Sequence, residues 1–303
     1  MTSQLTRDQA FFGFSADIEP VARVQQGEEL HLTTHDCFSG QLKTVEDTLE
    51  TLDWSITNPA TGPIYIEGAK PGDVLRVHLH EVKAHGPSVM VAVPQVGALG
   101  HLITQEETVI VPVVGDSVVY KDKVTVKQDP MLGVIGVAPA PADGTIPNST
   151  PGSHGGNMDC TLIRTGAKLY LTVAVEGALF GCGDMHAVMG DGEVVVCGAE
   201  TPGEVRLTSQ VVDIPGLPTP FVENDDIVAV IASAETVDEA YKLALDMMHT
   251  FLTKIAGLTV NDAALLMSLV GNLRFCQVVD PLLTVRFEFP KEVLAAYGFE
   301  MPA

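Results

Sequence analysis

The sequence predicts a mainly β protein in which two helices come late in the chain. Short runs rich in β-branched residues, separated by Gly, Pro, Asn and Asp, recur from residue 28 to residue 233. Leu, Met and Phe recur at helical spacing after residue 236. The 303 residues, 46% of them hydrophobic, can build a sizeable core. We expect one composite unit over residues 1–303, with a β-rich part (1–233) and a part made of a helical hairpin and terminal strands (234–303).

The expected strands follow one another along the β-rich part. Residues 28–35 alternate apolar and polar side chains, as half-buried strands do. Within residues 74–82, His78 and His80 point to the same strand face, because side chains alternate across a strand. Zinc enzymes use this His-x-His spacing, and chance also produces it on a half-exposed strand. Further strands are expected within 88–114, 129–141, 192–200, 203–212, 222–233, 273–280 and 283–289.

Two helices are expected in the C-terminal part. Thr236 and Glu239 have the spacing of a capping box, in which each side chain bonds the other residue's backbone N–H. The apolar residues that follow at helical spacing end at Gly257, and glycine commonly ends helices. A second helix is expected over 262–270, with Asn261 as its N-cap and Gly271 at its end.

Two glycine-rich segments concentrate metal-competent side chains. Residues 147–159 end in Asn157 and Asp159, and residues 181–193 carry Asp184 and His186. Glycines permit positive φ and let the chain turn its neighbours inward. The run between them, 160–180, indicates strand, turn, strand, and such a hairpin would bring the two segments together. Carboxylates and imidazole could then converge on one cation, although Asp and Asn beside glycines are also ordinary turn residues.

Composition excludes several kinds of partner. The formal net charge is −22, so nucleic acid and anionic membrane surfaces are disfavoured. The first residues show no basic segment followed by an apolar one, and no run approaches the roughly 20 apolar residues of a membrane helix. We therefore expect a soluble, cytoplasmic protein that acts on a small ligand.

The five cysteines do not predict a disulfide framework. Cys37, Cys160, Cys182, Cys197 and Cys276 are scattered, odd in number and without a C-x-x-C pair. Small buried residues are the favoured interpretation, with a nucleophilic thiol as the alternative. No G-x-G-x-x-G segment precedes a helix, and neither a Walker sequence nor a G-x-S-x-G elbow is present. Nucleotide binding and a serine-hydrolase elbow therefore have no sequence support.

Taken together, several stretches resemble the acetamidase/formamidase family. They are His35–Gln41, Asn58–Asp73, Gly152–Asp159, Gly181–Glu193 and Cys276–Pro281, in the family's order. The resemblance implies hydrolysis of small aliphatic amides to a carboxylate and ammonia, with divalent metal binding. It also implies a mainly β architecture, a β-sandwich or pseudo-barrel, with an α+β portion that carries the two late helices.

The resemblance also indicates site residues by motif. His35 and Asp36 match a His-Asp element, and Asn157 and Asp159 match a Gly-Gly-Asn-x-Asp element. Asp184 and His186 match a third element, Gly-Asp-x-His. The expected metal ligands are His35, Asp36, Asp159, Asp184 and His186, and they need not all bind one ion.

Metal chemistry would suit this reaction, because an ion can polarise the amide carbonyl and lower the pKa of water. Zn²⁺ is the expected ion, and an oxygen-rich subset of ligands could hold Ca²⁺ instead. Glu67 or Glu176 is the candidate base, and Asn157 could bond the substrate or hold a ligand in place. Two alternatives stay open: hydrolysis of another C–N bond, or a metal-stabilised β-rich binding protein without turnover.

The expected partners follow from the same reasoning. We expect a small neutral amide as substrate, and a homodimer or a higher homo-oligomer as the assembly, since so hydrophobic a chain is apt to expose an apolar surface.

Overall fold

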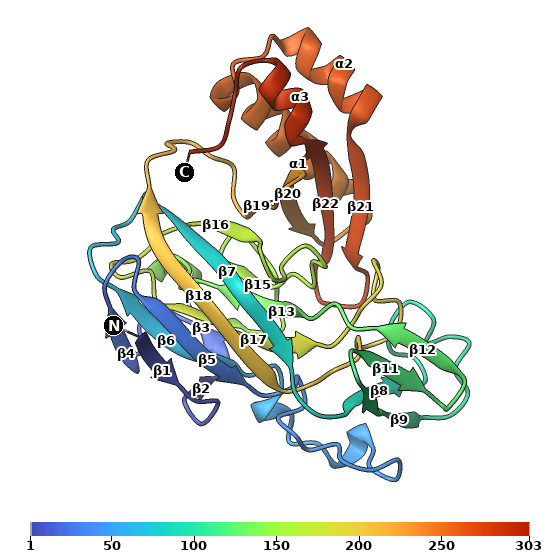
Figure 1. Ribbon diagram of the computed structural model, residues 1–303. Coiled ribbons are helices and arrows are strands. Elements are labelled where there is room, and N and C mark those ends of the chain that lie inside the picture. Colours follow the sequence, from blue (N-terminus) through green and yellow to red (C-terminus); the bar gives the residue numbers. More distant parts are fainter. Residues whose placement is uncertain (1, 303) are drawn as a thin grey trace.

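The computed structural model describes residues 2–302 and confirms the mainly β fold (Figure 1). Its largest sheet has nine strands and runs through both the N-terminal and the C-terminal parts of the chain. The strands, in spatial order, are β1 (Thr2–Leu5), β5 (Glu29–Thr34), β18 (Gly203–Val212), β7 (Val74–Ala84), β16 (Lys168–Thr172), β19 (Phe221–Glu223), β20 (Ile227–Ala234), β22 (Leu283–Pro290) and β21 (Asn272–Gln277).

A second, six-stranded sheet carries the central glycine-rich segments. In spatial order it contains β15 (Gly155–Asn157), β13 (Met131–Gly136), β17 (Phe180–His186), β6 (Ala60–Ile66) and β2 (Ala10–Phe11), and β4 (Ala22–Val24) pairs with β6. The main core joins apolar side chains of both sheets, among them Leu75 and Leu79 of β7 with Leu132 and Phe180 of the smaller sheet. The two sheets therefore share one hydrophobic core.

Three small sheets complete the β structure. β10 (Val113–Val114), β11 (Ser117–Tyr120) and β12 (Val124–Lys127) form an antiparallel meander, and β8 (Ser88–Ala92) pairs with β9 (Glu107–Val111). β14 (Ile146–Pro147) pairs with β3 (Gly13–Phe14). In Figure 1 the strands β8, β9, β11 and β12 lie together at one side of the molecule, beside the central sheet.

The late helices form as the sequence predicts, with one cap corrected. α1 (Val237–Thr250) begins at the Thr236–Glu239 capping box, and its chain continues through a π-helical turn, Phe251–Ile255. α2 (Val260–Val270) ends at Gly271, but its N-cap is Thr259, whose hydroxyl accepts the N–H of Asp262. Asn261 instead lies inside the first turn. A short third helix, α3 (Lys291–Ala296), was not predicted.

The helices cover the C-terminal end of the nine-stranded sheet. α1 packs on β20 and β22, and a second core surrounds it with Phe221, Phe251 and Phe287 (Figure 1). Within residues 2–302, no helix has the length and apolarity needed to cross a membrane.

The predicted hairpin over 160–180 is wrong. Residues 160–167 form no strand apart from an isolated bridge at Arg164. β16 lies in the nine-stranded sheet, whereas the next strand, β17, lies in the six-stranded sheet. The β-branched pattern indicates strands but does not specify their partners. The two glycine-rich segments still meet, because β13 lies between them and pairs with both β15 and β17.

The predicted strand over 192–200 is also wrong. This segment forms only isolated bridges, Gly192 with Gln277 and Glu200 with both Val89 and His186. Val194 and Val195 line a surface pocket, whereas Val196 packs against the apolar cluster around Cys37 and Cys197.

Candidate active site

A cluster of buried acids lies where β13, β15 and β17 meet the irregular segment that follows β17. Asp159, Asp184 and Glu200 are at most 2% exposed, Glu193 is 8% exposed, and His186 is 1% exposed. Four carboxylates thus surround one imidazole in the interior. Among residues 2–302, the imidazole of His186 is the ion-pair partner of Asp159, Asp184 and Glu200, and no lysine or arginine pairs with any of the four carboxylates. Such a concentration of buried negative charge calls for a compensating cation.

Gly133 allows two of these carboxylates to approach each other. It lies in β13, between Leu132 and Val134, which pair with Met185 and Gly183 of β17. A Cβ atom built on Gly133 would stand 2.3 Å from Oδ1 of Asp159 and 2.4 Å from Oδ2 of Asp184. The missing side chain therefore makes the space in which both carboxylates sit.

Three of the acids occupy a left-handed backbone conformation. The φ angles are 45° for Asp159, 52° for Asp184 and 40° for Glu193. Non-glycine residues rarely adopt such angles, which cost of order 1–3 kcal/mol each where the surrounding structure imposes them. The fold thus holds three strained residues so that their carboxylates turn toward one point. Backbone strain concentrated in this way is typical of functional sites.

His186 is the centre of the cluster. Its Nε2 lies 3.0 Å from Oε1 of Glu200, 3.4 Å from Oδ1 of Asp184 and 3.9 Å from Oδ1 of Asp159. Burial lowers the pKa of His186, but the carboxylates of Glu200 and Asp184 outweigh burial and raise this pKa well above its usual range. In the absence of a bound cation the imidazolium partly compensates the carboxylates around it.

Burial also shifts the acids toward their protonated forms. It raises the pKa of Asp159 and of Glu193 well above their usual ranges, and the other carboxylates add to the effect. For Glu200, burial raises the pKa to about 7, while His186 opposes the shift. These acids would ionise fully only where a positive charge replaces the lost water.

Asn157 and Asp280 flank the cluster. Nδ2 of Asn157 donates to Oδ2 of Asp280 at 2.8 Å, and the Oε1 atom of Gln277 accepts the backbone N–H of Asp280. Gln277 is itself buried and donates to Thr284 at 3.0 Å. Asp280 is partly buried, and its pKa is raised well above its usual range by burial and by Glu193. Asn157 thus connects the six-stranded sheet to the β21–β22 turn and positions a fifth carboxyl group.

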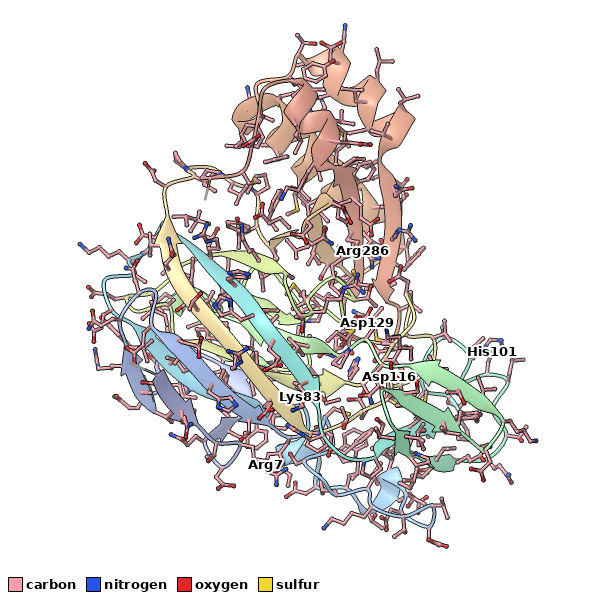
Figure 2. All side chains as sticks on the ribbon, in the orientation of Figure 1. Arg7, Lys83, His101, Asp116, Asp129 and Arg286 are labelled. Carbon is pink, nitrogen blue, oxygen red and sulfur yellow. The ribbon has the colours of Figure 1, made fainter. Side chains whose placement is uncertain are left out.

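The loop that carries Glu193 is fixed by an arginine of the C-terminal sheet. Nη1 and Nη2 of Arg286 donate to the two carboxylate oxygens of Asp191, at 2.9 and 2.7 Å. The backbone N–H of Gly192 donates to the carbonyl of Cys276. Figure 2 shows Arg286 on β22, in the half of the strand that lies nearer the central strands. This two-point ion pair holds the loop that presents Glu193 to the cluster.

The donor set fits a divalent cation. Both carboxylate oxygens of Asp159, Oδ1 of Asp184, Oε2 of Glu200 and Nδ1 of His186 are buried without a hydrogen-bond partner. Two groups have ligand atoms within 4.8 Å of one another: Asp159 with His186 and Glu193, and Cys37 with Asp184 and Glu200. Carboxylate oxygen, imidazole nitrogen and thiolate sulfur are the ligand types of Zn²⁺.

Cys37 belongs to this cluster, although no chemistry was predicted for it. Burial, followed by the charges of Glu200 and Asp184, raises the pKa of its thiol well above the usual range. A protonated thiol is a poor nucleophile, so the structure does not support Cys37 as one unless a cation is bound beside it. All five cysteines are buried and unbridged.

Of the eight predicted site residues, the structure brings Asn157, Asp159, Asp184 and His186 together. Asp36 lies next to the cluster but outside both ligand groups, and its Oδ1 accepts the N–H groups of Phe38 and Gly40. Its carboxylate therefore shapes the turn that carries Cys37. His35 also lies outside both groups, and burial and Arg7 lower its pKa.

The two predicted bases lie apart from the buried cluster. Glu176 is exposed. Glu67 lies at the surface, 3.5 Å from the Arg23 guanidinium. His78 and His80 lie side by side with ring centroids 4.3 Å apart, but within residues 2–302 they join no group of three potential ligands. We do not carry Glu67 or Glu176 forward as proton-transfer groups.

The sequence interpretation missed Glu193, Glu200 and Asp280. Two of them stand inside stretches that resemble the family, Gly181–Glu193 and Cys276–Pro281, so their positions were available as a signal. Glu200 is the last residue of the segment that we predicted as a strand. No motif around Glu200 indicated its bridge to His186.

Comparisons with known proteins agree with this fold. The profile of the Acetamidase/Formamidase family matches residues 3–143 and 140–294. The crystal structure of an acetamidase from Bacillus halodurans is 39% identical with a TM-score of 0.95, over 98% of this chain and 100% of that chain. That of a predicted acetamidase/formamidase from Thermoanaerobacter tengcongensis is 43% identical with a TM-score of 0.95, over 99% of each chain.

A curated acetamidase from Mycolicibacterium smegmatis is 24% identical over 65% of each chain. The chain spans 59–65% of the length of the curated relatives it matches. The family match and the structural relatives confirm the resemblance and agree with the predicted enzyme class, an amidase. The chain belongs to the acetamidase/formamidase family.

Proposed function

We propose that this protein hydrolyses small neutral amides to a carboxylate and ammonia, and that it needs a divalent cation held by the buried acid cluster. The observation that carries the proposal is the set of buried, unpartnered carboxylate and imidazole atoms on Asp159, Asp184, Glu200 and His186. The family membership supplies the reaction class. Zn²⁺ suits the mixed oxygen and nitrogen ligands, and Ca²⁺ suits the carboxylates alone.

In this proposal, one set of residues binds the cation and another residue transfers protons. Asp159, Asp184, His186 and Glu200 would hold the cation, which when bound would polarise the amide carbonyl and lower the pKa of water. Glu193 reaches the cluster from the side of a surface pocket. We assign it the proton transfer: its carboxylate accepts a proton from the attacking water, and the resulting acid returns that proton to the departing ammonia.

The surroundings of the cluster support these roles. The buried walls exclude bulk water, which strengthens every charge interaction inside. Burial raises the pKa of Glu193 well above its usual range, which strengthens its carboxylate as a proton acceptor in the first step.

Ammonia release from formamide and acetamide tests the proposal. The protein is measured as purified, after chelation with its metal content verified, and after Zn²⁺ or Ca²⁺ is returned. We expect activity that disappears with the metal and returns with it. Activity that survives verified metal removal would contradict the metal dependence, and Glu193→Gln with an unchanged rate would contradict its assignment.

The alternatives are distinguished by the same preparation. No turnover of any linear amide, together with a melting temperature that falls on chelation, would favour the binding protein. Turnover of a carbamoyl or cyclic amide in place of a linear one would favour hydrolysis of another C–N bond.

A further inference from the structure

An apolar pocket of about 610 Å³ adjoins the acid cluster. One wall is the β11–β12 hairpin, and the opposite wall is the irregular segment from Val188 to Ala199. Pockets of roughly 300–1,000 Å³ accommodate drug-sized ligands, so this volume far exceeds what formamide or acetamide needs.

The hairpin presents an apolar face to the pocket. Val118 pairs with Val126 and Tyr120 pairs with Val124, so all four side chains share one face. All four line the pocket. The opposite face of β12 carries Thr125 and Lys127, which do not. The alternation places apolar side chains toward the pocket even though Val124 is 52% exposed and Val126 is 38% exposed.

The pocket and the acid cluster share residues. Glu193 lines the pocket and also belongs to the ligand group of Asp159 and His186. Gly198 lines it too, and its backbone N–H donates to Oε1 of Glu200 at 3.0 Å. A Cβ atom on Gly198 would stand 2.9 Å from Nδ1 of His186. A molecule whose polar end reaches the cluster would therefore extend its other end along this pocket.

The pocket offers little to a charged substituent. Its charged lining residues are Asp191 and Glu193, and among the described residues it contains no lysine or arginine. Both carboxylate oxygens of Asp191 already accept hydrogen bonds from Arg286. The rest of the lining is apolar apart from the hydroxyl of Tyr120 and the thiol of Cys197. An anionic substituent would lose its hydration here without gaining a partner.

We propose that this pocket binds the apolar acyl group of the amide, so that the enzyme prefers amides with a longer aliphatic or an aromatic acyl group to formamide and acetamide. This inference rests on the proposed amidase function and names its substrate class. The Val118–Val126 face of the hairpin sets the preference, and the acid cluster receives the amide group.

The first experiment is a series of primary amides measured by ammonia release: formamide, acetamide, propionamide, butyramide and benzamide, with succinamate as an anionic control. Each buried methylene contributes about 0.8 kcal/mol, which corresponds to about a fourfold gain in kcat/KM. Butyramide should therefore exceed acetamide by about 15-fold, and succinamate should fall below butyramide.

The second experiment places a charge in the pocket. Val126→Asp should lower the ratio of kcat/KM for butyramide to that for acetamide by about tenfold or more, because the acyl chain would then meet a carboxylate. Thr125→Asp is the matched control, one residue away on the opposite face of the same exposed strand, and should leave the ratio unchanged. Sedimentation of both variants shows whether the hairpin face instead joins two copies of the chain.

The results distinguish a failure of the pocket proposal from a failure of the proposed amidase function. Hydrolysis in which acetamide equals or exceeds butyramide would overturn the pocket proposal and leave the amidase intact. A Val126→Asp variant that changes the oligomeric state but not the ratio would also overturn it, in favour of a subunit interface. If no amide is hydrolysed, the proposed function fails and this inference fails with it.

Discussion

Replacing Gly133 by alanine would place a methyl group between the carboxylates of Asp159 and Asp184. The added Cβ atom would stand 2.3 and 2.4 Å from their oxygens, well inside any normal contact, and both acids are buried and cannot swing into solvent. The backbone of Gly133 lies outside the left-handed region, so alanine itself causes no backbone strain there. The perturbation is therefore purely steric and acts on the cation ligands.

The expected cost can be stated for both stability and metal content. Overpacking a tight interior costs typically 1–3 kcal/mol. For a chain of this size, 1 kcal/mol corresponds to a melting-temperature change of roughly 2–4 °C, so Gly133→Ala should lower the melting temperature by roughly 2–12 °C. Separation of the two carboxylates should lower the bound metal and the amidase rate by about tenfold or more, since even the loss of a side chain that only supports a metal ligand costs about 10–100-fold.

The assay combines thermal unfolding, metal quantification and ammonia release on the same preparation. Gly190→Ala is the matched control for unfolding and metal content, because a Cβ atom there meets nothing within 4 Å and its φ is not positive. Its rate is not compared, because Gly190 lines the pocket proposed for the acyl group. A Gly133→Ala variant with wild-type metal content and rate would refute the assignment of Asp159 and Asp184 as joint ligands.

Three further predictions concern the surroundings of the site. In the metal-free protein, the raised pKa of Glu200, about 7 against 4.5, means that the folded state retains a proton that the unfolded state releases. The unfolding free energy should therefore fall by on the order of 3 kcal/mol from this group as pH rises from 4.5 to 7 in urea titrations. It should fall further above pH 7, because the raised pKa of His186 acts in the same direction; a rise would contradict the burial argument. We expect kcat to stay within about twofold of the wild-type value in Glu67→Gln and in Glu176→Gln, because both residues lie outside the buried acid cluster. A large loss of kcat in steady-state kinetics would indicate that the replaced residue acts as the base. Arg286→Lys should remove the two hydrogen bonds from the guanidinium to Asp191 and lower the unfolding free energy by about 1–3 kcal/mol. It should also weaken Zn²⁺ affinity in a calorimetric titration. Unchanged affinity would show that the Glu193 loop does not need the Arg286–Asp191 ion pair.

Short motifs predicted much of the site because they encode its local geometry. Glycines beside Asp159 and Asp184 indicated loops that could turn acids inward, and the structure places both acids in left-handed backbone. Whether an acidic residue near these motifs lies in the site or at the surface depends on how the strands pair. Glu67 and Glu176 occur within or beside the resembling stretches, yet the strands they follow carry them to the surface.

Long-range pairing explains what the sequence could not show. Glu200 reaches His186 through an isolated bridge between segments that have no periodic pattern in common. The hairpin predicted over 160–180 failed for the same reason, since its two ends pair with strands distant in the chain. The late helices were predictable because a capping box and a glycine end are local signals.

The double variant Asp159→Ala, His186→Ala tests the central claim most directly, with bound metal and ammonia release from acetamide and butyramide measured together. Glu67→Ala, Glu176→Ala is its control, since both of those residues lie outside the buried cluster. We expect the first variant to lose bound metal and turnover together, while the control retains both. A folded Asp159→Ala, His186→Ala protein that keeps its metal and its rate would show that these two residues do not hold a catalytic cation.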